Sequence, residues 1–187
     1  QDGPVFLYVG RVSREKNIEA FLSAELPGIK AVVGDGPHLR TLAERFPGVH
    51  FMGRRTGKEL ACLFASADVF VFPSRTDSFG LVILEALASG LPVAAYPVTG
   101  PLDILEDGVS GAIDTDIARA ALRALSLSRT DARRRALDFT WRRTAEMFLD
   151  NIRYSRAAAS APLAAPSATP SRSAAEKACT PTAIRRL

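Results

Sequence analysis

The sequence predicts an α/β domain built on a doubly wound parallel sheet. From residue 5 to residue 113, short apolar segments that suit buried strands alternate with helical segments, and the connections between them are short. Strands and helices that alternate in this way form parallel sheets through right-handed crossovers. Ligands bind such sheets at the carboxyl ends of the strands. The segments that follow each strand are therefore where we expect a functional site.

Each element of this domain is predicted from its local pattern. Strands are predicted at residues 5–9, 29–33, 49–52, 69–72, 93–96 and 111–113, where apolar residues run together. The run from Val69 to Phe72 is apolar throughout, as expected for a strand that is buried on both faces. Helices are predicted between the strands at residues 17–24, 37–46, 57–66, 79–89 and 102–106, the first with Asn17 as its N-cap.

The rest of the chain is predicted to be helical and then disordered. After residue 115 the pattern is helical only, and one helix carries an apolar stripe, typical of a packing helix, at Trp141, Ala145, Phe148, Leu149 and Ile152. From residue 157 the composition changes to Ala, Pro and Ser, which offer little apolar surface to bury. We therefore predict one folded domain at residues 1–156 and a disordered tail at residues 157–187.

Composition and charge narrow the functional classes. Of the 187 residues, 47% are hydrophobic and 24% charged, as in soluble globular proteins, and no apolar run reaches the ~18 residues of a membrane-spanning helix. Two cysteines favour a reducing cytoplasm. The net charge of +4 includes a cluster of arginines at positions 119, 123, 129, 133, 134, 135, 142, 143, 153 and 156. Such a cluster suits anionic lipid or nucleic acid, but we favour a solvated helical face.

Two carboxylates, Asp77 and Glu85, lie eight residues apart across a predicted loop-to-helix junction. The amides near Phe79, Gly80 and Leu81 are expected to begin this helix, so they lack intrahelical acceptors and carry the positive end of its dipole. A helix N-terminus of this kind binds anions, and phosphate is the commonest of them. Glu85 lies more than a turn inside the helix, where it is suited to accept hydrogen bonds from the hydroxyls of a ribose or a sugar.

Two further strand ends carry candidate residues. After the first strand, Gly10 allows close backbone approach to a ligand, and Arg11 and Lys16 supply cations that suit a diphosphate. After the second strand, Gly34 and Gly36 form a tight turn. These glycines do not continue into the G-x-G-x-x-G pattern of a dinucleotide-binding fold, which in any case follows the first strand.

Together these motifs resemble those of the retaining glycosyltransferases of family 4. The segment from Asp77 to Glu85 is similar to the E-x7-E signature of that family, with an aspartate at the first position, and the segment from Gly10 to Lys16 is similar to its G-R-x-x-x-E-K segment. The resemblance covers about residues 5–152. It implies a Rossmann-like domain that forms the C-terminal, donor-binding half of a GT-B fold.

The resemblance also implies roles for individual residues. Arg11 and Lys16 are implied to hold the leaving diphosphate of a nucleotide-sugar donor, Asp77 the hydroxyls of the donor sugar, and Glu85 the ribose. Further donor-binding positions are implied at Gly10, Gly34, Gly36, Met52, Gly53, Ser78, Phe79, Gly80 and Leu81, with Arg54 and Arg55 as neighbours. The donor is a substrate, so no cofactor is expected. No metal ion is expected either, because the two histidines and two cysteines show no metal-ligand spacing and the resemblance implies that Arg, Lys and a helix N-terminus neutralise the diphosphate.

The text of residues 74–80 and 94–105 resembles the branch that contains GDP-mannose-dependent α-mannosyltransferases. A lipid or glycan acceptor is implied, with a cytoplasmic location, peripheral association with the inner face of the membrane, and no nucleic-acid partner. Because a GT-B enzyme needs a second domain for its acceptor, we expect this chain to be part of a larger protein. Four alternatives remain: a catalytically incomplete nucleotide-sugar-binding fragment, a UDP-sugar-dependent transferase, a dinucleotide-dependent oxidoreductase, and a basic interaction module.

Overall fold

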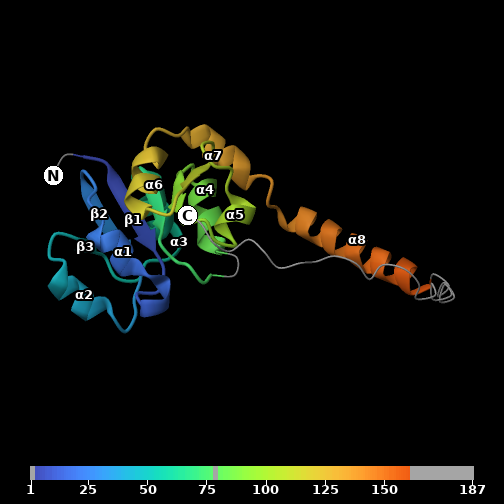
Figure 1. Ribbon diagram of the computed structural model, residues 1–187, viewed down its shortest axis with the longest axis horizontal. Helices are drawn as coiled ribbons and strands as arrows, with labels where there is room; N and C mark the ends of the chain where they lie inside the picture. The colour runs from blue at the N-terminus through green and yellow to red at the C-terminus, as the bar shows by residue number, and fades with distance from the viewer. Residues whose placement is uncertain (1–2, 78–79, 161–187) are drawn as a thin grey trace, which may run out of the picture. The chain divides into compact units, whose positions relative to one another are not determined.

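The computed structural model describes residues 3–77 and 80–160, and the chain divides into two units, residues 1–146 and 147–187. The first unit contains a six-stranded parallel sheet with strand order β3-β2-β1-β4-β5-β6 (Figure 1). Its strands are β1 (Val5–Val9), β2 (Ile29–Val33), β3 (His50–Phe51), β4 (Val69–Phe72), β5 (Val93–Ala95) and β6 (Gly111–Ile113). The predicted doubly wound α/β fold is confirmed.

The strand order reverses between β1 and β4, and this reversal creates a place for a ligand. β1 pairs in parallel with β2 on one side and with β4 on the other. The chain leaves β1 towards β2 but leaves β4 towards β5, so the two connections diverge from neighbouring strand ends. A crevice at the carboxyl ends of the strands is expected at such a switch point.

Helices cover both faces of the sheet because successive side chains of each strand point to opposite faces. Phe6 and Tyr8 of β1 pack in one core cluster, whereas Leu7 packs in the other. The first cluster includes residues from α1 (Ile18–Ser23), α2 (Leu39–Arg45) and α6 (Ile117–Ala124). The second includes residues from α3 (Gly57–Ser66), α4 (Leu81–Ala88), α5 (Pro101–Ile104) and α7 (Arg129–Ala136).

The predicted element boundaries were less accurate than the element order. α4 begins at Leu81 after Gly80, whose φ of 77° is left-handed, so the helix starts later than the expected residue 79. Asn17 precedes α1 as predicted, but its side chain makes no capping hydrogen bond to the helix. It donates instead from Nδ2 to the carbonyl of Pro73, 3.0 Å away, on the loop after β4.

Arginines of α7 also act as structural anchors, a role that the interpretation of a solvated helical face did not include. Arg129 donates to the carbonyl of Ala67 at 2.6 Å, just after α3, and Arg133 donates to Ala88 at the end of α4. Arg135 donates to Ile104, the last residue of α5, at 2.7 Å. Helix C-termini leave carbonyls without intrahelical donors, and cations near them also interact favourably with the helix dipole. Other arginines of the cluster form ion pairs within the chain.

α8 (Trp141–Ser160) forms where a helix was predicted and continues past residue 157, the predicted start of the tail. Its large apolar side chains are exposed, among them Trp141, Met147 and Phe148, so the packing of its apolar stripe stays a prediction. The rest of the predicted tail, residues 161–187, lies outside the described residues. No helix within the described ranges is long and apolar enough to cross a bilayer.

Candidate functional site

A cavity of about 580 Å³ lies at the switch point, and we call it the switch-point cavity. It brings together the four residues for which catalytic roles were implied, Arg11, Lys16, Asp77 and Glu85. The other residues that line it are Tyr8, Val9, Gly10, Phe72, Ser74, Gly80, Leu81 and Val82. The cavity is therefore assembled from the segments that follow β1 and β4, which are far apart in the sequence and adjacent in the sheet.

An ion pair joins the two sides of the switch-point cavity. Lys16, at the end of a short 3₁₀ helix (Arg14–Lys16), donates from Nζ to Oδ1 of Asp77. The lysine side chain is 28% exposed and the aspartate side chain 22%, so both remain partly in contact with solvent. This pair was not predicted, because the resemblance implied separate roles for the two residues.

The loop that carries Asp77 is held in place by several contacts. Besides the hydrogen bond from Asn17 to Pro73, the hydroxyl of Thr76 donates to the carbonyl of Glu15 at 3.4 Å. Arg75 lies over the ring of Tyr96, with its guanidinium carbon 4.1 Å from the ring centroid. Such cation–π contacts contribute about 0.5–1 kcal/mol at exposed sites. The loop is thus fixed against both the segment after β1 and the end of β5.

Tyr8 supports the other wall and was missed by sequence reasoning, because a buried tyrosine in a strand looks like an ordinary core residue. Its side chain is buried, and its hydroxyl donates to the backbone carbonyl of Arg11 at 2.8 Å. Burial raises the pKa of Tyr8, and the nearby carboxylates of Asp77 and Glu15 raise it further. The phenol therefore stays protonated and serves as a donor that fixes the Gly10–Arg11 backbone.

α4 presents its N-terminus to the switch-point cavity. Leu81 and Val82 in its first turn line the cavity, and so does Glu85 one turn further along. The amide of Ile83 already bonds to the carbonyl of Gly80 at 2.8 Å, which closes the first turn of the helix. The positive end of the helix dipole thus lies beside Arg11 and Lys16, which favours an anion in this part of the cavity.

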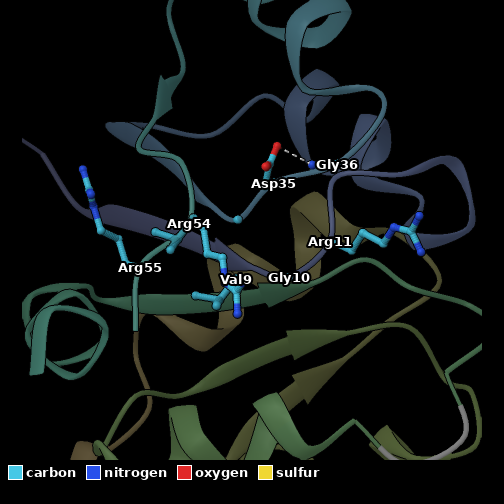
Figure 2. Close-up of a pocket in the computed structure, with 9 residues that line it drawn as sticks. Val9, Gly10, Arg11, Asp35, Gly36, Arg54 and Arg55 are labelled. Atoms are coloured by element: carbon cyan, nitrogen blue, oxygen red, sulfur yellow. Dashed lines mark hydrogen bonds between the residues drawn. The ribbon is translucent and has the colours of Figure 1, made fainter. Parts of the chain in front are cut away.

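A second cavity of about 550 Å³ adjoins the first, and we call it the loop cavity (Figure 2). Gly10 and Arg11 line both cavities. Asp35 lies in the loop after β2, where its carboxylate accepts the amide of Gly36 at 2.7 Å, drawn as a dashed line in Figure 2. The residues that line the loop cavity are Val9, Gly10, Arg11, Val33, Gly34, Asp35, Gly36, Arg54 and Arg55. Three arginines against one carboxylate make this cavity electropositive.

The glycines of the loop cavity are needed because two loops run against each other. The amide of Val12 bonds to the carbonyl of Asp35 at 2.9 Å, so the segments after β1 and β2 touch along their backbones. A Cβ atom on Gly34 would overlap the carbonyl oxygen of Gly10, and one on Gly36 would overlap that of Val12. The predicted tight turn is therefore explained by close backbone approach.

The structure places most of the implied donor-binding residues in these two cavities, but not all of them. Met52 packs partly buried against the second core cluster, and the carbonyl of Gly53 accepts the amide of Gly34, a residue that lines the loop cavity, at 2.9 Å. Their neighbours Arg54 and Arg55 line it instead. Ser78 and Phe79 lie outside the described residues. Within the described ranges, no group of three or more His, Cys, Asp or Glu side chains could hold a metal ion.

Fold and site together define a Rossmann-like domain of the GT-B type, with its ligand cavities at the switch point of the sheet. The family model of glycosyl transferases group 1 matches residues 3–128. The chain therefore belongs to this glycosyltransferase family.

Three known proteins illustrate the relationship. The chain is 41% identical over 106 residues to a GDP-mannose-dependent α-mannosyltransferase of Corynebacterium glutamicum, a match that covers 56% of this chain and 26% of that protein. It is 42% identical over 113 residues to the sulfoquinovosyl transferase SQD2 of Arabidopsis thaliana, with 58% and 22% covered. The structure of sucrose-phosphate synthase from Thermosynechococcus elongatus matches with a TM-score of 0.69 and 28% identity, over 84% of this chain and 46% of that one. The chain thus spans less than half the length of each of these proteins.

Proposed function

We propose that this chain is the donor-binding domain of a retaining hexosyltransferase that uses a nucleoside-diphosphate sugar, with GDP-mannose as the donor. The observation that carries the proposal is the switch-point cavity, where Arg11, Lys16 and the N-terminus of α4 surround one space with Asp77 and Glu85. Cations beside a helix N-terminus suit a diphosphate, and carboxylates suit the hydroxyls of sugars.

In the proposed reaction the diphosphate is the leaving group. Negative charge develops on it as the bond to the anomeric carbon breaks, and Arg11, Lys16 and the first amides of α4 stabilise that charge. Asp77 accepts hydrogen bonds from the donor sugar, and Glu85 accepts them from the ribose. Ser74 adds a buried hydroxyl whose oxygen has no hydrogen-bond partner within the described part of the chain.

The nucleoside would extend into the loop cavity, which shares Gly10 and Arg11 with the switch-point cavity. Arg54 and Arg55 lie there, and arginine pairs well with the O6 and N7 acceptors of guanine. The similarity to a GDP-mannose-dependent enzyme adds support for guanine and mannose. The crystal structure of Anabaena Alr3699/HepE, a protein of similar fold, contains UDP-glucose, so a UDP-sugar donor is the second candidate. A lipid or glycan acceptor would bind at a second domain.

Calorimetric titration of the chain with GDP, UDP and NAD tests the proposal. We expect one nucleoside diphosphate to bind and the Arg11→Ala, Lys16→Ala double variant to lose at least about 100-fold in affinity, because two charge-assisted hydrogen bonds are removed. The matched control is an Arg40→Ala, Arg142→Ala variant, which removes two exposed cations elsewhere. The proposal is refuted if NAD is the only one of the three that binds. It is also refuted if the double variant binds GDP and UDP as tightly as the wild-type chain does.

The donor sugar is tested next by comparing GDP-mannose with UDP-glucose in the same titration. Tighter binding of GDP-mannose is expected. If UDP-glucose binds and GDP-mannose does not, the second candidate replaces the first.

A further inference from the structure

Lys16 and Asp77 form an ion pair, although the proposed function assigns these two residues to different parts of the donor. Lys16 is assigned to the diphosphate and Asp77 to the sugar, yet in the structure each is the partner of the other. The inference that follows rests on the proposed function and concerns what this pair does when a ligand arrives.

Asp77 is held where it can reach Lys16. Its loop is tied to the segment after β1 by the hydrogen bonds from Asn17 to Pro73 and from Thr76 to Glu15. Both side chains are less than one-third exposed, so the pair is more shielded than the ion pairs of the outer helices, such as the one between Arg40 and Glu44 at 92% and 69% exposure. Solvent and salt therefore screen it less.

A diphosphate bound at Lys16 must share the ammonium group with the carboxylate of Asp77 or displace it. Two negative groups beside one cation repel each other, and the repulsion is stronger where solvent is partly excluded. The repulsion is relieved if the carboxylate finds another partner. The hydroxyl groups of a donor sugar are such a partner, because they donate hydrogen bonds to a carboxylate.

We propose that Asp77 is a specificity-determining residue that makes the site prefer the complete nucleotide sugar to the free nucleoside diphosphate. Before the donor binds, its carboxylate is the counter-ion of Lys16. When the donor binds, the sugar hydroxyls hold the carboxylate and the diphosphate takes over Lys16. Once the sugar has been transferred, Asp77 loses its hydroxyl partners, returns to Lys16 and promotes release of the nucleoside diphosphate.

The Asp77→Asn variant tests this directly, since it keeps the size of the side chain and removes its charge. Titrations with GDP and GDP-mannose, and with UDP and UDP-glucose, give a ratio of affinities for each pair. We expect the variant to bind the free diphosphate about 3- to 10-fold more tightly than the wild-type chain, from the usual strength of a partly exposed ion pair plus relief of repulsion. The advantage of the nucleotide sugar over the free diphosphate should fall accordingly.

Two controls separate this effect from a general change in charge. Glu25→Gln removes an exposed carboxylate elsewhere and should leave both affinities unchanged. In a Lys16→Met background, Asp77→Asn should tighten the binding of the diphosphate less than it does with Lys16 present, because the ion pair is already broken and only the relief of repulsion remains. Thermal unfolding of each variant confirms that it is folded.

The possible results are distinct. If the wild-type chain binds neither GDP nor UDP, the proposed function fails and this inference fails with it. If the wild-type chain binds one of them, but Asp77→Asn binds it no more tightly than Glu25→Gln does, the inference alone is overturned. The inference is also overturned if Asp77→Asn tightens the binding of the diphosphate equally with lysine and with methionine at position 16, because the effect would then not depend on Lys16.

Discussion

Replacing Gly34 by alanine should separate the two loops that build the loop cavity. The new Cβ atom would overlap the carbonyl oxygen of Gly10 and lie 2.9 Å from its carbonyl carbon. Both atoms belong to backbone, which is held there by a hydrogen bond from the amide of Gly10 to the carbonyl of Val33 at 3.0 Å. The clash therefore cannot be relieved by turning a flexible side chain.

The expected cost has two parts. Gly34 has a φ of 144°, a conformation that residues with a Cβ rarely adopt, and such strain costs about 1–3 kcal/mol. Forcing extra volume into a close-packed place adds about 1–3 kcal/mol. The two parts together give an expected loss of about 2–6 kcal/mol in the free energy of unfolding, a large fraction of the ~5–15 kcal/mol typical of a domain.

Urea denaturation followed by circular dichroism measures this loss, and two other glycines provide matched controls. Gly48→Ala has open space around the new Cβ and no positive φ, so its stability should change by less than about 1 kcal/mol. Gly53→Ala also has open space but a φ of 66°, so the strain alone should cost about 1–2 kcal/mol. If Gly34→Ala is no less stable than Gly53→Ala, the argument from close backbone approach is refuted.

Two further predictions concern a single hydroxyl and a single carboxylate. Tyr8→Phe removes the donor to the carbonyl of Arg11, so it should cost about 1 kcal/mol of stability. It should also weaken GDP or UDP binding several-fold, as measured by calorimetry. The same binding loss in Tyr96→Phe, which changes a tyrosine at the end of β5, would contradict this prediction. Hydrogen bonds from Arg119 lower the pKa of Asp114, so the stability from this pair is present above the unfolded pKa of about 3.9 and is lost as pH falls through the folded pKa. Asp114→Asn should therefore unfold at lower urea concentration than the wild-type chain at pH 7, and the difference should shrink below about pH 4; a difference independent of pH would rule this out.

The order of the elements could be predicted because runs of apolar residues indicate buried strands, and β4 and β5 are buried along their whole length. The four residues of β4 are all buried, as the apolar run indicated. Boundaries were harder, since they depend on local backbone geometry. The hydrophobic pattern did not indicate that Gly80 would adopt a left-handed backbone conformation and that α4 would begin only after it. Nor did it indicate that β3 would contain only the two residues His50 and Phe51.

The candidate site could be predicted as a set of residues but not as a set of contacts. Motif spacing placed Arg11, Lys16 and Asp77 in segments that follow strands and Glu85 in the helix after Asp77, and parallel topology then brings such segments together. The ion pair between Lys16 and Asp77 depends on the exact path of two loops, which spacing does not determine. The same is true of the role of Tyr8, which depends on a hydrogen bond to backbone rather than on its residue type.

The contacts of the arginines of α7 could not be predicted from the sequence either. Their density in the sequence suggested a single cationic face, but a guanidinium group can reach across to a neighbouring helix. Arg129, Arg133 and Arg135 each donate to a carbonyl at or just after the end of a different helix. The density of arginines in the sequence does not tell where their hydrogen-bond donors are directed.

The position of β1 explains why one loop serves both cavities. In the observed strand order β1 lies between β2 and β4, so the segment after β1 is beside the loops of both neighbours. Gly10 and Arg11 line the two cavities for this reason. A ligand that fills both must cross Arg11 at its middle, and a nucleotide sugar carries its negative charge there, between a nucleoside and a sugar. In the switch-point cavity the carboxylates of Asp77 and Glu85 lie beside Arg11 and Lys16, whereas in the loop cavity Asp35 lies with Arg54 and Arg55. The paired cavities thus suit a ligand that carries its phosphate charge near Arg11 and presents hydroxyl groups to the carboxylates of the switch-point cavity.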